Sequence, residues 1–215
     1  MRVLVPYDTH DPKTRLGPIL DECERQSFAA AMCRHVLAAV ERAGHDPTVL
    51  ATGPVESADP LADATAERSV EVRVDERPLS PAVNDVLAAT ERPLAVVVAD
   101  LPLVTSAAID RLMAPDAPVV LAPGLGGGTN GLVVDHPDFR VDYHGGSYRA
   151  HREAAAAVGA RVETVDSFRL AVDVDAPGDL GEVLLHGEGA AADWLEAAGF
   201  ELSFEEGRAT VERGG

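Results

Sequence analysis

The chain has few aromatic residues, few cysteines and almost no lysine, and it lacks any long apolar run. Phe, Trp and Tyr make up 4% of its 215 residues, and there are two cysteines. Cys23 and Cys33 have no CxxC motif or histidine cluster beside them, so neither a zinc site nor a disulfide framework is expected. No apolar run approaches the roughly 20 residues that cross a bilayer, and no signal pattern is seen. We therefore expect a soluble, cytoplasmic protein without a membrane partner.

The charge of the chain is strongly one-sided. Asp and Glu number 36 against 18 Lys and Arg, a formal net charge of −18, and every basic residue except Lys13 is an arginine. Nucleic acid is not an expected partner, because binding phosphates along a strand needs a basic face. A hydrophobic content of 46% argues against disorder. An acidic surface of this kind preserves solubility in concentrated salt, and we hypothesise a halophilic origin.

The apolar pattern predicts a single α/β domain over residues 1–215, since domains contain about 100–200 residues. Short apolar runs alternate with segments of helical periodicity, which favours an open, mostly parallel sheet with helices on both faces. Strands are expected at 1–6, 48–51, 70–74, 94–99, 118–122, 161–165 and 169–172, and helices at 21–43, 81–90, 105–113, 147–158, 178–185 and 190–198. A hairpin turning at Glu206 and Gly207 closes the chain.

The central feature of the sequence is the run LAVVVADLPL, residues 94–103. Its unbroken apolar residues predict a strand buried on both faces, with Asp100 at its carboxyl end. In open α/β sheets, ligands bind at this edge. The alternative is that Asp100 only caps the next helix, but it lies too early for that, and Thr105 can form the cap itself. Asp100 is therefore a candidate functional carboxylate.

The only lysine lies in an irregular loop after the first strand. Lys13 and Arg15 are close together in the segment PKTRL. Such a loop is well placed to meet a polyphosphate. An ordinary exposed basic loop is the alternative.

Two glycine-rich segments carry hydroxyl and amide side chains. PGLGGGTNGLVV, residues 123–134, is predicted to be a loop in which Thr129 and Asn130 follow three glycines, and YHGGSYRAH, residues 143–151, places Ser147 at the start of a helix. The first segment lacks the lysine of a P-loop. Exposed N–H groups beside hydroxyls suit an anion or a nucleobase. A flexible linker and a simple helix cap are the alternatives.

Two further carboxylates follow the last predicted strand of the sheet. Alternation along DVD places Asp173 and Asp175 on the same side of an extended chain. Asp175 could serve only as the cap of the helix starting near Pro177, whereas Asp173 has no such role. Together with Asp100 they form a set suited to Mg²⁺, which prefers oxygen ligands and shares its coordination shell with substrate phosphates.

The segments PKTRL, ADLPL, GGGTNGL, HGGSYRAH and DVDAPGDL occur in an order that resembles the 2-phospho-L-lactate guanylyltransferase family, CofC, of coenzyme F-420 biosynthesis. The resemblance covers almost the whole chain. It implies a Rossmann-like GT-A, or nucleotide-diphospho-sugar transferase, fold. It also implies transfer of GMP from GTP to 2-phospho-L-lactate, giving lactyl-2-diphospho-5′-guanosine and pyrophosphate. Some relatives use phosphoenolpyruvate, and relatives imply a homodimer.

The resemblance implies roles for particular residues. The metal-binding aspartates, with Mg²⁺, fall on Asp100, Asp173 and Asp175. Lys13 and Arg15 face the nucleotide, and with Asp100 they are the catalytic candidates. The contacts to the small acid fall on the hydroxyls of Thr129 and Ser147 and on the backbone of Gly145 and Gly146. Asn130, Gly127 and Gly128 are further substrate-binding candidates, from the glycine-rich segment itself.

Two positions depart from the family pattern. Asp8 stands where many relatives carry a lysine shortly after the first strand, and a carboxylate cannot hold phosphate directly. His144, beside the glycines, has no role to carry over. Two other functions remain open at this stage: a MobA-like or sugar-nucleotide nucleotidyltransferase, and a non-catalytic module that binds an anion.

Overall fold

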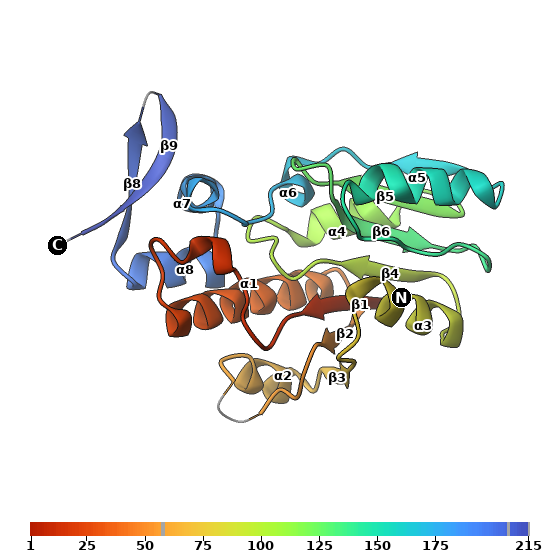
Figure 1. Cartoon of the computed structure of the whole chain (residues 1–215), viewed down its shortest axis with the longest axis horizontal. Helices are drawn as coiled ribbons and strands as arrows, with labels where there is room; N and C mark the ends of the chain where they lie inside the picture. The colour runs from red at the N-terminus through yellow and green to blue at the C-terminus, as the bar shows by residue number, and fades with distance from the viewer. Residues whose placement is uncertain (57–58, 206, 215) are drawn as a thin grey trace.

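The computed structural model describes residues 1–56, 59–205 and 207–214 and contains a seven-stranded sheet with helices on both faces (Figure 1). Across the sheet the strands lie in the order β3 (Glu71–Val74), β2 (Asp46–Ala51), β1 (Arg2–Tyr7), β4 (Leu94–Val97), β6 (Thr129–Val134), β5 (Val119–Pro123) and β7 (Val162–Thr164). Only β6 runs antiparallel to its neighbours. The predicted α/β class with a mostly parallel sheet is confirmed.

The helices alternate with the strands along the chain. They are α1 (Glu22–Arg42), α2 (Ala62–Arg68), α3 (Leu79–Ala89), α4 (Ser106–Met113), α5 (Ser147–Ala157), α6 (Phe168–Ala171), α7 (Leu180–His186) and α8 (Ala190–Ala197), with short 3-10 turns at Thr14–Leu16 and Pro177–Asp179. The hairpin of β8 (Phe200–Glu205) and β9 (Arg208–Arg213) forms a separate two-stranded sheet. This confirms the predicted hairpin, although Glu206 of its turn lies outside the described residues.

Three apolar cores hold these elements together. Helices α1, α2, α4 and α6 contribute to the core on one face of the sheet, and α3 and α5 to the core on the other. A third core joins the first half of α1 to α7, α8 and the start of β8. Strand β4 lies in the middle of the sheet with Leu94 and Val96 in one core and Ala95 and Val97 in the other, as expected of a strand buried on both faces.

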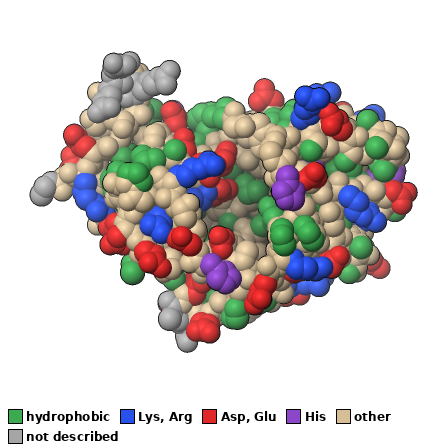
Figure 2. Space-filling model, in the orientation of Figure 1, with side chains coloured by type: hydrophobic (Ala, Val, Ile, Leu, Met, Phe, Trp, Pro, Cys, Tyr) green, Lys and Arg blue, Asp and Glu red, His purple; other side chains and the backbone are tan. Residues whose placement is uncertain are grey.

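Helix α1 begins and ends close to where the sequence predicts. Asp21 accepts a hydrogen bond from the backbone N–H of Glu24, and the Glu24 carboxylate accepts one from the N–H of Asp21, which is a capping box. Gly44 follows the helix with a φ of 75°, a conformation that favours glycine. Among the described residues, no helix has the length and apolarity needed to cross a bilayer. Acidic side chains are spread over the face seen in Figure 2.

Two parts of the predicted secondary structure are wrong. Residues 129–134, predicted as part of a glycine loop, form strand β6, and residues 169–172, predicted as a strand, lie largely in the single turn of α6. Gly131 makes β6 look unlike a strand, but a Cβ there would lie 2.8 Å from Leu112 of α4, so the glycine allows this helix to pack closely. A run of four residues around Leu170 is too short to distinguish a strand from a helix.

Candidate active site

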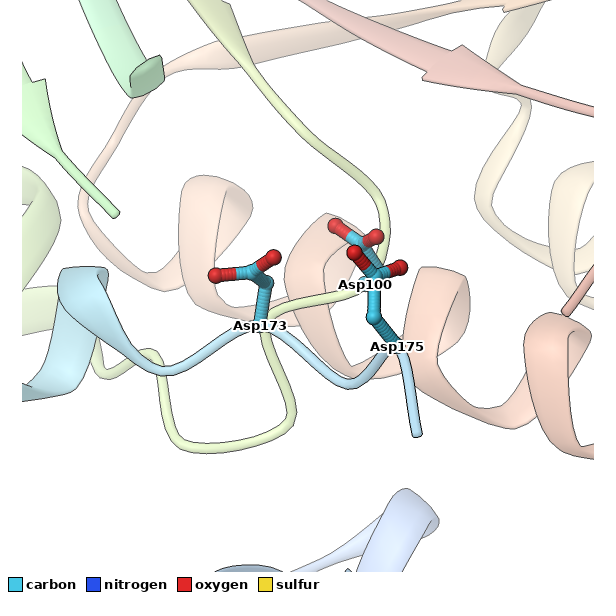
Figure 3. A group of neighbouring side chains, drawn as sticks. All are labelled: Asp100, Asp173 and Asp175. Atoms are coloured by element: carbon cyan, nitrogen blue, oxygen red, sulfur yellow. The ribbon is translucent and has the colours of Figure 1, made fainter. Parts of the chain in front are cut away.

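Three carboxylates converge at the carboxyl end of β4 (Figure 3). One oxygen from each of Asp100, Asp173 and Asp175 lies within 4.8 Å of the oxygens from the other two. Asp100 follows β4, and the other two lie in the segment after α6, more than seventy positions later in the chain. The structure therefore brings together the three aspartates that the sequence singled out.

Backbone and core contacts explain why these segments meet. The N–H of Val174 donates to the carbonyl of Asp100 at 3.2 Å, and the Val174 side chain is fully buried in the third core. Since successive side chains of an extended chain point in opposite directions, burial of Val174 turns its two acidic neighbours toward Asp100. The DVD pattern thus acts as expected, although it lies in a loop rather than at the end of a strand.

Lys13 reaches into this carboxylate cluster. Its Nζ donates to Asp100 Oδ2 at 2.5 Å and to Asp175 Oδ1 at 3.2 Å, and its side chain is 13% exposed. Burial alone would lower the pKa of Lys13, but the charges and hydrogen bonds of Asp100 and Asp175 outweigh it and the pKa is raised. Lys13 is therefore a cation at neutral pH. Arg15 lies farther out, 76% exposed and 3.6 Å from Asp175.

Lys13 pairs with Asp100 and Asp175, and among the described residues it makes no ion pair with Asp173. Burial raises the pKa of Asp173; a hydrogen bond of 3.0 Å from Asn130 Nδ2 opposes this shift, and the charge of Asp100 adds to it. The negative charge at Asp173 is thus under-compensated by protein groups. A cation beside it would stabilise the ionised form.

The cluster fits a divalent metal ion by two observations. Its donors are carboxylate oxygens, the ligands that Mg²⁺ prefers. In addition, Asp100 Oδ1 is buried and has no hydrogen-bond partner among the described residues. A buried carboxylate oxygen without a partner is costly, and a bound cation would satisfy it.

The glycine loop lies beside the cluster because β5 and β6 form a hairpin at the same edge of the sheet. Gly124 N donates to Gly128 O at 2.9 Å, and Gly127 takes a φ of 82°. Asn130 packs against Gly124, where a Cβ would lie 2.6 Å from its Oδ1, and its amide reaches Asp173. Asn130 therefore contacts both the glycine loop and the carboxylate cluster.

The start of α5 closes the other side of the glycine loop. Ser147 Oγ accepts a hydrogen bond of 2.9 Å from the N–H of Thr129, and the N–H of Tyr148 donates to the carbonyl of Gly127 at 3.2 Å. Gly146 occupies the N-cap position of α5, so Ser147 is not the cap. Gly145 precedes it with a φ of 64°. The structure thus brings the predicted acid-binding residues together at one glycine-rich surface, on which Gly127 and Gly145 are exposed, whereas Thr129 and Ser147 are each only 3% exposed.

Sequence reasoning missed His151, which supports this surface from behind. The ring is fully buried, and its Nδ1 lies 2.9 Å from Thr129 Oγ1. It packs edge-on against Tyr143 at 4.9 Å between ring centroids. The position of His151 four residues after Ser147 on a helix is the only sequence signal that could have pointed to it. His144, in contrast, is exposed and pairs with Asp142 at 2.8 Å.

A cavity of about 400 Å³ opens on the opposite side of Asp100. Its wall comes from the ends of β1, β2 and β4, the residues just after β3, and helices α1 and α3, and the hollow near the centre of Figure 2 shows apolar side chains at its floor. The volume lies within the range of small-molecule sites. Lys13 and Asp100 line the cavity as well as the carboxylate cluster, so the two are continuous.

Lys13, Asp100 and Asp8 were singled out from the sequence, but the other polar groups of the cavity, among them Thr52, Asp75 and Arg77, were not. Asp8 Oδ1 accepts from Thr52 Oγ1 at 2.9 Å, which ties the end of β1 to the end of β2. Arg77 pairs with Asp75 at 2.6 Å and with Asp85 at 2.6 Å, and its hydrogen bond is the first cause of the lowered pKa of Asp75. These residues had no recognisable motif, because the short strands that carry them meet only in the folded sheet.

A family model described as guanylyl transferase CofC like matches residues 1–213. The chain belongs to this family. It is 54% identical to the 2-phospho-L-lactate guanylyltransferase of Halomicrobium mukohataei, over 99% of this chain and 100% of that protein. It is 56% identical to the protein of the same name from Haloarcula marismortui, over 99% of both chains. The family and the enzyme class expected from the sequence are confirmed.

Solved structures confirm the expected fold. A structure described as a nucleotide-diphospho-sugar transferase from Desulfovibrio desulfuricans G20 matches with a TM-score of 0.69 at 15% identity, covering 91% of this chain and 94% of the other. The inositol-1-phosphate CTP transferase of T. maritima matches with a TM-score of 0.56 at 10% identity, covering 91% and 96%. Similarity at this level of identity concerns the fold alone.

Proposed function

We propose that the protein transfers GMP from GTP to 2-phospho-L-lactate and releases pyrophosphate. The observation that carries this proposal is the convergence of Asp100, Asp173 and Asp175 between a cavity of small-molecule size and a glycine-rich surface bearing hydroxyls. A reaction between two phosphorylated substrates needs two adjoining binding sites with a charge-neutralising centre between them. The names of the relatives with half or more of their residues identical support the choice of substrates.

We assign the nucleoside of GTP to the cavity and the triphosphate to the region of Lys13. The cavity has apolar walls from Ala29, Met32 and Leu79, which suit the faces of a purine. The Asp8 carboxylate accepts hydrogen bonds from Thr52 Oγ1 at 2.9 Å and from the N–H of His10 at 3.0 Å, so in this assignment it holds the end of β1 and does not bind phosphate. The absence of a lysine at position 8 is therefore compatible with this assignment.

Asp100, Asp173 and Asp175 are the residues that would hold Mg²⁺. When bound, the ion supplies positive charge that offsets the negative charge of the phosphates. The chain itself contributes Lys13, which lines the cavity and neutralises the departing pyrophosphate, and the exposed Arg15, which lies 3.6 Å from Asp175.

The acid is proposed to bind at Thr129, Ser147 and the amides of the glycine loop, with Asn130 linking them to Asp173. A phosphate oxygen of the acid then attacks the α-phosphorus of GTP. The new P–O bond forms as the bond from the α-phosphorus to the bridging oxygen breaks, and pyrophosphate leaves. No general base is needed, because the attacking phosphate is already ionised at neutral pH.

The test is to incubate the protein with Mg²⁺, one nucleoside triphosphate and one acid at a time, and to identify products by mass. We expect lactyl-2-diphospho-5′-guanosine and pyrophosphate from GTP and 2-phospho-L-lactate. The Asp100→Asn protein serves as the control for contaminating activity. A product from phosphoenolpyruvate alone would change the assigned acid, and binding without any product would overturn the proposal in favour of a non-catalytic module.

A further inference from the structure

His151 contacts Thr129, one of the proposed acid-binding residues, but is itself buried. It lies on α5 one turn after Ser147, is fully buried, and its Nδ1 is 2.9 Å from the hydroxyl oxygen of Thr129. Within the described part of the chain its other nitrogen, Nε2, is buried without a hydrogen-bond partner. Tyr143 and Phe139 flank the ring, with centroids 4.9 and 6.1 Å away. Among the described residues, the contact with Thr129 is thus the one hydrogen bond of the His151 ring.

The ring is neutral at physiological pH. Burial lowers the pKa of His151 to about 4, and the charge of Asp142 opposes this only in part. A neutral imidazole carries one N–H, on either Nδ1 or Nε2. A proton on Nε2 would leave a buried N–H without an acceptor, which is the rarer and costlier defect in proteins. The proton therefore belongs on Nδ1, where it is donated to Thr129.

The Ser147 hydroxyl also accepts a hydrogen bond from the protein. The N–H of Thr129 donates to Ser147 Oγ at 2.9 Å, and a backbone N–H is only ever a donor. Ser147 thus accepts from the protein and keeps its own hydroxyl hydrogen for another acceptor. If His151 donates to Thr129, the Thr129 hydroxyl is in the same state. Each hydroxyl then has its hydrogen available for a bound acceptor.

We propose that His151 is a positioning residue that fixes the Thr129 hydroxyl as a hydrogen-bond donor to the anionic acid substrate. This inference rests on the proposed function, since it takes the acid to bind at Thr129 and Ser147. A donor oriented before the substrate arrives loses no energy in reorientation when the anion binds.

The first test determines the tautomer without any assay of activity. The wild-type protein is labelled with ¹⁵N-histidine, and the ring nitrogens are recorded by NMR at neutral pH, with the His151→Phe protein to assign the signals. We expect a protonated Nδ1 and an unprotonated Nε2. A protonated Nε2 would overturn the proposal, because Thr129 would then donate its only hydroxyl hydrogen to the ring.

The second test separates positioning from packing by steady-state kinetics. His151→Phe keeps an aromatic ring but has no donor, whereas His151→Asn retains an N–H near the place of Nδ1. We expect His151→Phe to raise the KM for 2-phospho-L-lactate about tenfold, with the KM for GTP within about twofold, and His151→Asn to restore much of the loss. His35 is the matched control: it is also buried, and its Nε2 donates to the carbonyl of Val104 at 2.8 Å, away from this surface.

The outcomes distinguish this inference from the proposed function. Equal changes in both KM values, or a similar change in His35→Phe, would mean that His151 acts only through packing and would overturn the inference. If His151→Phe does not fold, His151→Asn assigns the NMR signals in its place, and the tautomer of the wild-type ring still decides the inference. A wild-type protein that forms no product from GTP and the acid would overturn the proposed function, whereas the tautomer result would be unaffected.

Discussion

The Lys13 ammonium donates to Asp100 Oδ2 at 2.5 Å across 87 positions of sequence. The only lysine of the chain thus occupies the carboxylate cluster, on the side of Asp100 and Asp175, while Asp173 is held by Asn130. The Lys13 ammonium neutralises two of the carboxylates that a bound cation would contact. Metal binding is therefore expected to free Lys13 for the phosphates of the nucleotide.

Lys13→Met should weaken the use of GTP more than that of the acid. Removal of a charge-assisted contact to the triphosphate should lower kcat/KM for GTP about 10- to 100-fold, with a smaller change in the KM for 2-phospho-L-lactate. Initial rates over a matrix of both substrate concentrations check this. Arg15→Met should have a smaller effect than Lys13→Met, because Arg15 is 76% exposed. A larger effect on the acid would mean that the loop serves the other substrate.

Asp173→Asn should remove activity and leave the fold intact. A lost metal ligand should lower kcat about 100-fold or more at saturating substrates. Because burial raises the pKa of Asp173, its ionised form is unfavourable in the free protein. Urea unfolding without metal should thus show a free energy equal to or above that of wild type. The exposed Asp116→Asn is the control, and near wild-type turnover in Asp173→Asn would exclude the carboxylate from the mechanism.

His151 should make the protein less stable in acid. Its folded pKa of about 4 lies below the usual 6.5, so the unfolded chain binds more protons between these values. Stability is therefore full above pH 6.5 and is lost as the pH falls toward 4, by about 2 to 3 kcal/mol. The measurement compares urea unfolding of wild type and His151→Phe at several pH values. The raised pKa of Asp173 acts in the opposite direction in both proteins, so equal pH slopes would contradict the prediction.

Ala82→Leu should obstruct the proposed nucleoside cavity. Ala82 faces the cavity from α3, and three added carbon atoms there should raise the KM for GTP about tenfold or more, with little change for the acid. Ala88 lies on the same helix but is exposed and does not line this cavity, so Ala88→Leu is the matched control. Unchanged GTP kinetics in a folded Ala82→Leu protein would show that the nucleoside does not bind in this cavity.

The excess of acidic residues should make the fold depend on salt. With a net charge of −18, screening by KCl should reduce self-repulsion and raise the midpoint of thermal unfolding. Scans at increasing KCl from dilute buffer upward test the halophilic hypothesis. Full stability and activity in dilute buffer would refute it.

The parts of the fold that were predictable are those with long, clear patterns. The capped helix after Asp21 and the buried strand before Asp100 follow from periodicity and capping chemistry alone. The three aspartates were found because each follows an apolar segment, but their convergence depends on the chain order of the sheet. The single domain, the homodimer and the cytoplasmic location stay predictions.

What the sequence concealed is set by packing between distant elements. Strand β6 contains Asn130 and Gly131, two residue types that are depleted in strands, and only the close approach of α4 explains the glycine. His151 looks like an ordinary helix residue until α5 is placed behind β6. Arg77 and Asp75 likewise gain a role only where β3 ends beside the cavity.

The pairing of β4 with β6 continues beyond the strand, where the N–H of Val98 donates to the carbonyl of Asn130 at 3.0 Å. Asp100 follows Val98 by two residues, and Thr129 precedes Asn130, so main-chain bonds of the sheet fix the spacing between the carboxylates and the hydroxyls. We expect acids with an extra carbon between phosphate and carboxylate to be poor acceptors, because hydrogen-bonded strands cannot move apart to fit a longer substrate.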